Sequence, residues 1–396
     1  MVLLNRARLK VRDERREIPR YTCLQQTDRQ MLELPRGEHP KGCYTGKRNM
    51  VEEDHIRLEL AVGEDHEIYA WPGETTFDLN EPSQFGVGGA MATGLFAMLL
   101  DGAMVADADP ASYRFLGRLN IAGRDMAEYS YHVPKARSHY TLADQFSRAI
   151  VGYQGTVRID VNTADVVQLT TTLDIPVTSM DLSAARLVLE YRREKIQFTE
   201  PLLVQSVDMD MVHMTGEEAH NRTIYSGCHM FATESTVHFD SVDDAAPANA
   251  AAAPRAITDV SAPPAGLPFQ MALTNPIDFE KQAIGDIVEA TLTSDLKDER
   301  GRLLAAKGSK VQARIVSFKH YVNGNSLLLG LRPERLIRKD GVVSPIRASL
   351  AKTPKGAVFT LAPKGTPRGT AFFTFEKLKA LSLAAGWTTA WVTIHE

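Results

Sequence analysis

The stretch IVGYQGTVRIDVNTADVVQLTTTLDI, residues 150–175, decides the fold. Its two halves are rich in Val, Ile, Thr and Tyr, the residue types that favour strands. The four polar residues NTAD, at positions 162–165, separate them. Two β-rich runs on either side of a short polar turn predict an antiparallel hairpin.

The same signal continues on both sides of this hairpin. Apolar and polar residues alternate along residues 21–27 and 56–62, which predicts strands with one buried face. Further strand-like runs occur at 67–71, 75–79, 113–119, 126–133, 185–198, 202–212 and 222–239. This succession of hairpins predicts a mostly β fold, with one large curved antiparallel sheet forming an open barrel over residues 1–240.

Two segments of this region have helical spacing. Residues 4–17 contain no Gly or Pro and place Leu4, Ala7 and Val11 on one narrow stripe, which predicts an N-terminal helix. The run FGVGGAMATGLFAMLLDGAMV, residues 85–105, predicts an apolar helix over 90–104 that covers the concave face of the sheet. The candidate ligand-binding residues, lining a hydrophobic cavity, are Met91, Leu95, Phe96, Met98 and Leu99.

The composition changes after residue 240. Residues 241–267 are dominated by Ala, Pro, Asp and Ser, which predicts a linker. Residues 268–396 contain short strand-like runs with Gly turns, which predict a small C-terminal β-barrel. Within it, residues 374–385 look like a short helix that ends at Gly386, followed by a closing strand.

Charge and hydropathy exclude several partners. A net charge of −4 supplies no polycationic surface for nucleic acid. No apolar run reaches the ~18–20 residues of a transmembrane helix. The start MVLLNRARLKVRDERREIP shows no secretory signal, which taken alone indicates the cytoplasm.

The sequence contains three cysteines, Cys23, Cys43 and Cys228. They allow three different single disulfides, of which Cys23 to Cys43 would close a loop of about 20 residues. Three buried thiols acting as small apolar residues are the alternative.

The search for catalytic chemistry predicts no catalytic residue, no metal site and no cofactor. Ser138 and His139 are adjacent on a strand-like run, so their side chains point to opposite faces and do not share a proton easily. A hydrolase built on residues 134–142 remains one hypothesis for the function. Asp65, His66 and Glu67 also lie in a strand-like run. Their side chains alternate between the two faces, so they cannot converge on one metal ion.

Several blocks of residues 1–240 resemble a group of uncharacterised secreted proteins from acidobacteria: RYTCLQQTDRQ, DHIRLELAVGEDHEIYAWPG, GGAMATGLFAMLL, EYSYHVPKARSHYTL, GYQGTVRIDVNTADVVQLT and ATESTVHFD. That group is remotely similar to the lipoprotein-carrier and sigma-factor-regulator fold, an open β-barrel with helices over its mouth. The run NPIDFEKQAIGDIVEATLTSDLKDERGRLLAAKGSKVQARIV, which begins at Asn275, is similar to a β-barrel module of conjugation-channel proteins.

These resemblances imply a periplasmic or secreted, non-enzymatic protein of the bacterial envelope. The first hypothesis is that it binds or carries a hydrophobic ligand or a lipidated partner. The alternative is a structural or assembly protein that acts on other envelope proteins through its β-domains without a small ligand. The two differ in whether the interior of residues 1–240 is hollow or filled, which the sequence leaves open.

Overall fold

A computed structural model of the chain describes residues 1–15, 20–37, 47–62, 67–74, 76–77, 98–105, 113–143, 148–175, 180–230, 236–237, 261–362, 366–378 and 380–395. The chain forms two compact units. The first comprises Met1–Val51, Leu58–Glu81 and Gly89–Thr236, and the second comprises Glu52–Arg57, Pro82–Gly88 and Val237–Glu396.

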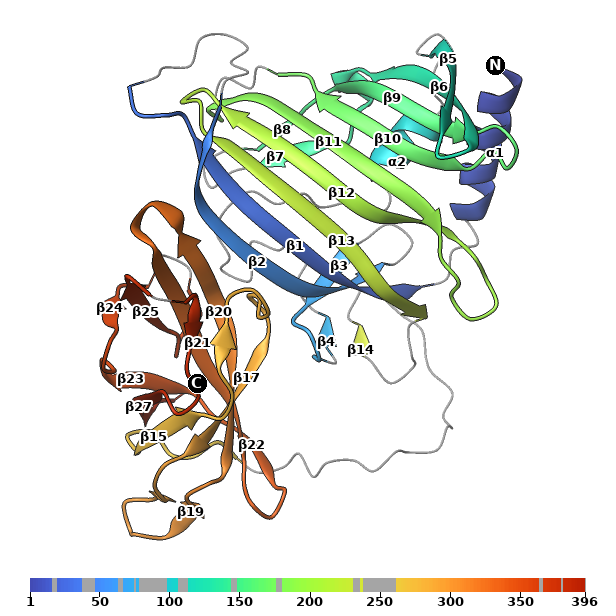
Figure 1. Cartoon of the computed structure of the whole chain (residues 1–396). Helices are drawn as coiled ribbons and strands as arrows, with labels where there is room; N and C mark the ends of the chain where they lie inside the picture. Colours follow the sequence, from blue (N-terminus) through green and yellow to red (C-terminus); the bar gives the residue numbers. More distant parts are fainter. Residues whose placement is uncertain are drawn as a thin grey trace. The chain divides into compact units, whose positions relative to one another are not determined.

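The first unit is built on a ten-stranded sheet, which confirms the predicted large antiparallel sheet (Figure 1). Its strands are β1 (Tyr21–Glu33), β2 (Asn49–Val62, of which residues 49–51 and 58–62 belong to this unit), β3 (Glu67–Ala70), β5 (Arg114–Ile121), β6 (Arg124–Val133), β9 (Tyr153–Asp160), β10 (Val166–Leu173), β11 (Leu182–Arg193), β12 (Leu202–His213) and β13 (Glu218–Met230). Their order is β3–β2–β1–β13–β12–β11–β10–β9–β6–β5, and every pairing whose register is described is antiparallel.

The alternation read from the sequence matches the burial of side chains. Tyr21, Cys23, Gln25 and Thr27 of β1 are all buried. The alternate positions 56, 58, 60 and 62 of β2 are buried as well. The hairpin of residues 150–175 forms as predicted, with β9 and β10 joined through a turn at residues 161–163.

Helix α1 (Val2–Arg15) packs against the turn of that hairpin. It buries Leu4, Ala7 and Val11, the stripe predicted for it. Its polar side contacts the turn directly: the Arg6 guanidinium donates to the carbonyl of Asn162 (2.6 Å). These polar contacts add to the apolar packing of the stripe.

Asp165, at the end of the turn, is the centre of the attachment. Its carboxylate accepts from Arg193 Nη2 (2.6 Å) and Nε (3.1 Å), and it pairs with Lys10 Nζ of α1 (2.8 Å). Burial alone would raise the pKa of Asp165, but the hydrogen bonds from Arg193 and Lys10 lower it to about 2. The ionised carboxylate is therefore the form that stabilises the fold.

The second unit is a sheet whose strands enclose a common core. Its main strands are β15 (Pro268–Leu273), β17 (Ile287–Leu292), β20 (Lys310–Tyr321), β21 (Ser326–Ile337), β23 (Ala348–Lys352), β24 (Val358–Thr360), β25 (Ala371–Glu376) and β27 (Thr388–Thr393). They pair antiparallel in the order β23–β27–β15–β17–β20–β21–β25–β24. No α-helix occurs among the described residues of this unit, yet Leu329, Phe373 and Trp391 are fully buried, so its strands wrap around a common interior.

A buried ionic network lies inside this second sheet. Arg314 is 1% exposed, and it donates to Glu334 Oε1 (3.0 Å) and to the carbonyl of Gly285 (2.8 Å). Burial would raise the pKa of Glu334, but Arg314 and then Arg332 lower it below its usual value. The pair is therefore satisfied on both sides, as a buried charge requires.

The predicted helix over residues 374–385 is wrong. Strand β25 continues to Glu376, a second short strand, β26, covers Ser382–Leu383, and Gly386 adopts a positive φ in the turn before β27. The rings of Phe373 and Phe375 both contact Trp387, so aromatic packing overrides local helix propensity. Residues 241–260 of the predicted linker lie outside the described residues, and Leu267 at its end is buried.

We expect Asp165→Asn to lower the free energy of unfolding by about 1.5–3 kcal/mol at neutral pH, because it weakens charged hydrogen bonds to Arg193 and Lys10. A lowered pKa gives stability that is fully present above the unfolded value of ~3.9 and is lost as pH falls toward about 2. Urea unfolding across this pH window should therefore show the gap between wild type and variant closing at low pH. Asp13→Asn, on an exposed pair with Arg12, is the control. A gap independent of pH contradicts the assignment.

Candidate binding face of the first unit

The register of the sheet arranges its buried side chains in rows that cross the strands. One row, from β6 to β1, contains Tyr129, Val157, Leu169, Leu189, Val207, Thr223 and Thr27. The next row contains Tyr131, Gly155, Thr171, Leu187, Met209, Asn221 and Arg29. We call the surface made by these rows and their continuation at Gln25 the inward face.

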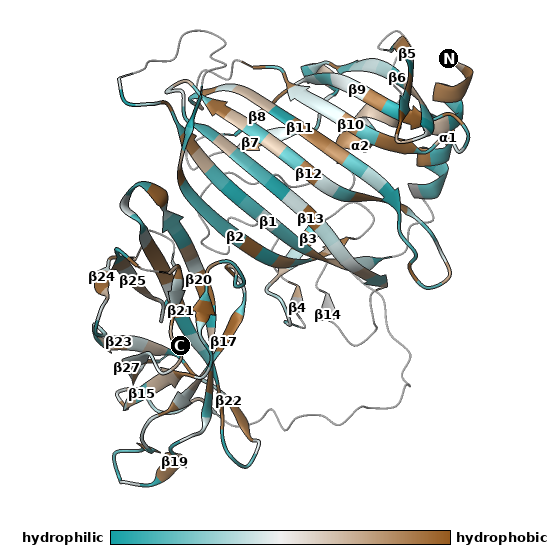
Figure 2. Cartoon of the chain, in the orientation of Figure 1, coloured by the Kyte–Doolittle hydropathy of each residue, from teal (hydrophilic) through white to brown (hydrophobic). Residues whose placement is uncertain are grey.

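The inward face is divided into two chemically different parts. The part on β9 to β12 is mainly apolar and we call it the apolar half. The part on β13 and β1 is polar and we call it the polar half: Gln25, Thr27, Arg29, Asn221 and Thr223. Each of these five residues is at most 7% exposed. Figure 2 shows the contrast, since β1 is mostly teal whereas brown segments recur along β9 and β11.

The polar half is hydrogen-bonded across its two strands. The hydroxyls of Thr27 and Thr223 lie 2.9 Å apart, and Gln25 Nε2 donates to Thr27 Oγ1 (3.4 Å). Arg29 stands opposite Asn221 in the register of β1 and β13. Burying polar groups costs free energy unless they are hydrogen-bonded, so a strip of them in the centre of a sheet is an unusual choice for a packing surface alone.

Tyrosines and one carboxylate lie beside the polar half. The Tyr69 hydroxyl donates to Glu67 Oε2 (2.8 Å). Burial, followed by the charge of Glu67, raises the pKa of both Tyr69 and Tyr225. These phenols therefore stay neutral and act as hydrogen-bonding groups rather than as acids or nucleophiles near neutral pH.

Helix α2 (Met98–Met104) covers β6 and β9 at the end of the sheet where α1 lies (Figure 1). Its residues Leu99, Leu100, Ala103 and Met104 are buried. Arg8 of α1 donates to the carbonyl of Met104 (2.9 Å), placing a cation at the helix C-terminus where it is favourable.

A close approach between helix and sheet fixes the position of α2. An ideal Cβ built on Gly102 would lie 1.9 Å from the Tyr153 hydroxyl and 3.2 Å from its Cζ. A larger residue at this position would displace the buried Tyr153 side chain. Burial, followed by the nearby charge of Asp101, raises the pKa of Tyr153 and keeps the phenol neutral.

The sequence-predicted ligand residues are placed only in part. Met91, Leu95 and Phe96 lie outside the described residues. Met98 begins α2, but its side chain lies outside the described part, and Leu99 is fully buried within the helix. The polar half was missed by sequence reasoning, although the spacing of Gln25, Thr27 and Arg29 was its signal.

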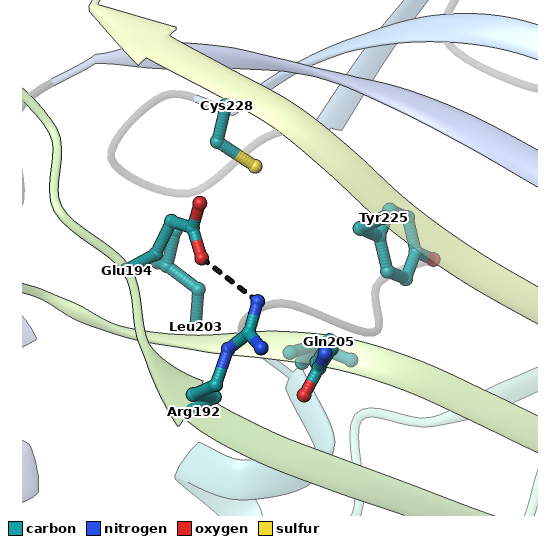
Figure 3. Close-up of a pocket in the computed structure, with 7 residues that line it drawn as sticks. Arg192, Glu194, Leu203, Gln205, Tyr225 and Cys228 are labelled. Atoms are coloured by element: carbon teal, nitrogen blue, oxygen red, sulfur yellow. Dashed lines mark hydrogen bonds and ion pairs between the residues drawn. The ribbon is translucent and has the colours of Figure 1, made fainter.

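A small pocket opens where β11, β12 and β13 meet (Figure 3). It is lined by Arg192, Glu194, Leu203, Val204, Gln205, Tyr225 and Cys228, and Arg192 Nη2 donates to Glu194 Oε2 (3.2 Å). Its empty volume of about 240 Å³ includes open solvent. Small-molecule sites usually enclose ~300–1,000 Å³, so this pocket is a notch beside Tyr225 rather than a ready-made ligand cavity.

The disulfide differs from the one singled out in the sequence. Cys23 is bonded to Cys228, with their Cα atoms 4.1 Å apart, and Cys43 lies outside the described residues. Of the three pairings that the sequence allows, the structure has Cys23–Cys228 and not Cys23–Cys43, because β1 pairs with β13, whose cysteine is 205 residues away in sequence. Gly227, at a positive φ, lies in the irregular stretch opposite Cys23.

The remaining candidates for chemistry are separated. The Ser138 hydroxyl is buried and accepts the backbone N–H of Tyr140 (3.0 Å), whereas His139 is exposed. In the described part of the chain, no cluster of three or more His, Cys, Asp or Glu side chains could hold a metal ion. Across the same residues, none of the helices combines the length and the apolar character needed to span a bilayer.

Comparison with known proteins gives a remote likeness. No protein-family model and no curated protein matches the chain. Among solved structures, it is similar to a lipoprotein-sorting protein domain from Vibrio parahaemolyticus (12% identity, TM-score 0.28, 56% of this chain and 89% of that one). It is also similar to a LolA superfamily protein from Nitrosomonas europaea (8%, 0.23, 57% and 93%) and to a DUF1329 family protein from Desulfovibrio piger (13%, 0.24, 58% and 92%).

Because all three TM-scores are below 0.3, the likeness carries no conclusion about function. The acidobacterial group and the conjugation-channel module stay predictions.

We expect Gly102→Ala to destabilise the first unit by about 1–3 kcal/mol, because the new methyl group overlaps the Tyr153 hydroxyl. An alanine in a helix would otherwise be about 1 kcal/mol more favourable than glycine. Tyr153→Phe removes the overlapping oxygen, so the double variant should lose much less stability than the sum of the two single variants. Urea unfolding of all four proteins measures this cycle, and additive losses would show that α2 does not rest on Tyr153.

Proposed function

We propose that this chain is a non-catalytic protein of the bacterial envelope that binds an acyl chain, free or attached to a lipidated partner, against the inward face of its first unit. The division of that face into an apolar half and a polar half supports this proposal. A hydrocarbon chain matches the apolar surface of β9 to β12. Hydrogen-bonding groups at the head of the same ligand match the amide, hydroxyl and guanidinium groups of β13 and β1.

The near-complete burial of the inward face adds a condition to the proposal. Side chains such as Leu187 and Asn221 are at most 4% exposed, so a ligand reaches them only when a covering element moves.

The disulfide supports the location in the envelope. Cys23 and Cys228 join two central strands of the first unit. Disulfides persist in secreted and periplasmic proteins and are rare in the cytosol, where thiols are kept reduced. An oxidising compartment is therefore part of the proposal.

The proposal is tested by the lipids that the purified chain carries and takes up. We expect mass spectrometry of the denatured protein to release a co-purified lipid, and the delipidated protein to bind a fluorescent fatty acid. Asn221→Leu should weaken binding of a probe with a polar head about three- to tenfold, the cost of one hydrogen bond, and leave a probe with a minimal head unchanged.

Gln30→Leu is the matched control, because Gln30 lies on β1 with its side chain on the opposite face from Arg29. Equal effects of the two variants would mean that the polar half does not select the head group. Absence of both co-purified lipid and probe binding would contradict the proposed function itself.

The alternative, an assembly protein without a small ligand, has one observation in its favour. On β24, at one edge of the second sheet, Val358 is 58% and Phe359 is 48% exposed, and Leu361 just beyond is 84% exposed. Exposed apolar strand edges are sites where other chains add a strand. A pull-down that Phe359→Lys abolishes, from a chain that carries no lipid, would favour this function.

A separate prediction concerns the cysteines. Peptide mapping without reductant should recover Cys23 linked to Cys228. Cys228→Ser should lower the free energy of unfolding by about 2–5 kcal/mol, and dithiothreitol should have the same effect on wild type but none on the variant. A Cys23–Cys43 peptide, or a protein equally stable with and without the bond, would remove this support for an oxidising compartment.

A further inference from the structure

Strand β5 is an edge of the first sheet that is exposed on both of its faces. Among the described residues it pairs only with β6. Six of its eight residues are exposed, and the turn at Ala122 and Gly123 that joins it to β6 is exposed as well. Strand β6 and the strands beyond it bury one face, so β5 differs from every interior strand.

Large apolar side chains are exposed along this hairpin. Phe115 is 50%, Leu116 is 42% and Ile121 is 40% exposed. The Phe115 ring lies 5.3 Å from the ring of Tyr129, which begins one of the inward rows. The exposed apolar edge is therefore continuous with the inward face.

Arginines alternate with these apolar residues. Arg114 and Arg118 are exposed, and within the described chain neither forms an ion pair. The third, Arg124, pairs with Asp160 (2.9 Å) while remaining 55% exposed. The acidic groups nearby are already engaged: Asp125 accepts from Asn120 (2.8 Å) and Glu128 from Arg158 (2.8 Å).

We propose that the β5–β6 hairpin is a membrane-contact edge that binds the surface of a bilayer containing anionic lipids. The arginines match lipid phosphates, and Phe115, Leu116 and Ile121 match the boundary between head groups and acyl chains. A partner protein adding a strand fits less well, because the ladder of β5 is irregular between Phe115 and Gly117. Such bulges protect edges against strand addition.

This proposal goes beyond ligand binding on the inward face and rests on different residues. Binding at this hairpin would bring the apolar edge of the sheet against the bilayer, which contains the acyl chains. Either proposal can fail alone: the hairpin can bind bilayers without any buried ligand, and the inward face can bind an acyl chain from solution.

The test is vesicle flotation of the full chain. We expect wild type to float with phosphatidylcholine vesicles that contain phosphatidylglycerol, to bind pure phosphatidylcholine weakly, and to be released by added salt. Arg114→Gln with Arg118→Gln should weaken binding to the anionic vesicles about fivefold for each charge. Leu116→Ser with Ile121→Ser should abolish the binding that remains in high salt.

Two controls separate the hairpin from general surface effects. Phe198→Ser removes an apolar side chain that is 99% exposed elsewhere in the first unit. Arg300→Gln with Lys355→Gln removes two exposed charges in the second unit. Neither should change flotation, and circular dichroism should show every variant folded.

Several outcomes would overturn the proposal. They are no flotation of wild type, equal binding to neutral and anionic vesicles, and equal losses in hairpin and control variants. Uptake of the fluorescent fatty acid from solution is measured in parallel. If the hairpin variants lose flotation but keep fatty-acid uptake, the membrane edge and the inward binding face are distinct functions, as proposed.

Discussion

The first unit depends on covering one face of a sheet ten strands wide. Burial of apolar surface, worth ~25 cal/mol per Å², is the main favourable term for such a sheet, and it requires an element on the inward side. Where the structure describes that side, the cover at β6 and β9 is α2, a helix of seven residues. So short a helix depends on its anchors: Gly102 against Tyr153, Arg8 at its C-terminus and, through α1, the carboxylate of Asp165. The turn at Asp165 thus holds α1, and α1 in turn holds α2 in place on the sheet.

Elements that are determined by a local pattern could be predicted from the sequence. The hairpin of residues 150–175, the alternation of Tyr21 and Cys23, and the stripe of α1 all depend on periodicities of two or about four residues. The helix expected over 374–385 failed because β25 pairs with β21 and its phenylalanines pack on Trp387, contacts that no local window contains. Intrinsic propensity gives way to such tertiary contacts.

The candidate site was harder to predict from the sequence, because it too depends on contacts between distant segments. Gln25, Thr27 and Arg29 alternate visibly, but alternation does not say which face is buried or what stands opposite. Only the pairing of β1 with β13 brings Thr223 and Asn221 beside them, across nearly two hundred residues of chain. The disulfide was hard to predict for the same reason. The sequence suggests a short loop between Cys23 and Cys43, and only the register of β1 and β13 places Cys228 next to Cys23.

The disulfide and the polar half belong to the same strand pair, and this coincidence has an energetic reason. Polar side chains gain little from burial, and each hydrogen bond such as Thr27 to Thr223 adds only about 0.5–1.5 kcal/mol net. The pairing of β1 with β13 therefore gains less from apolar burial than the apolar half does. A covalent link across that pair offsets the deficit by restricting the unfolded chain over 205 residues. The covalent link and the cross-strand hydrogen bonds thus hold together the strand pair on which the proposed head-group contacts lie.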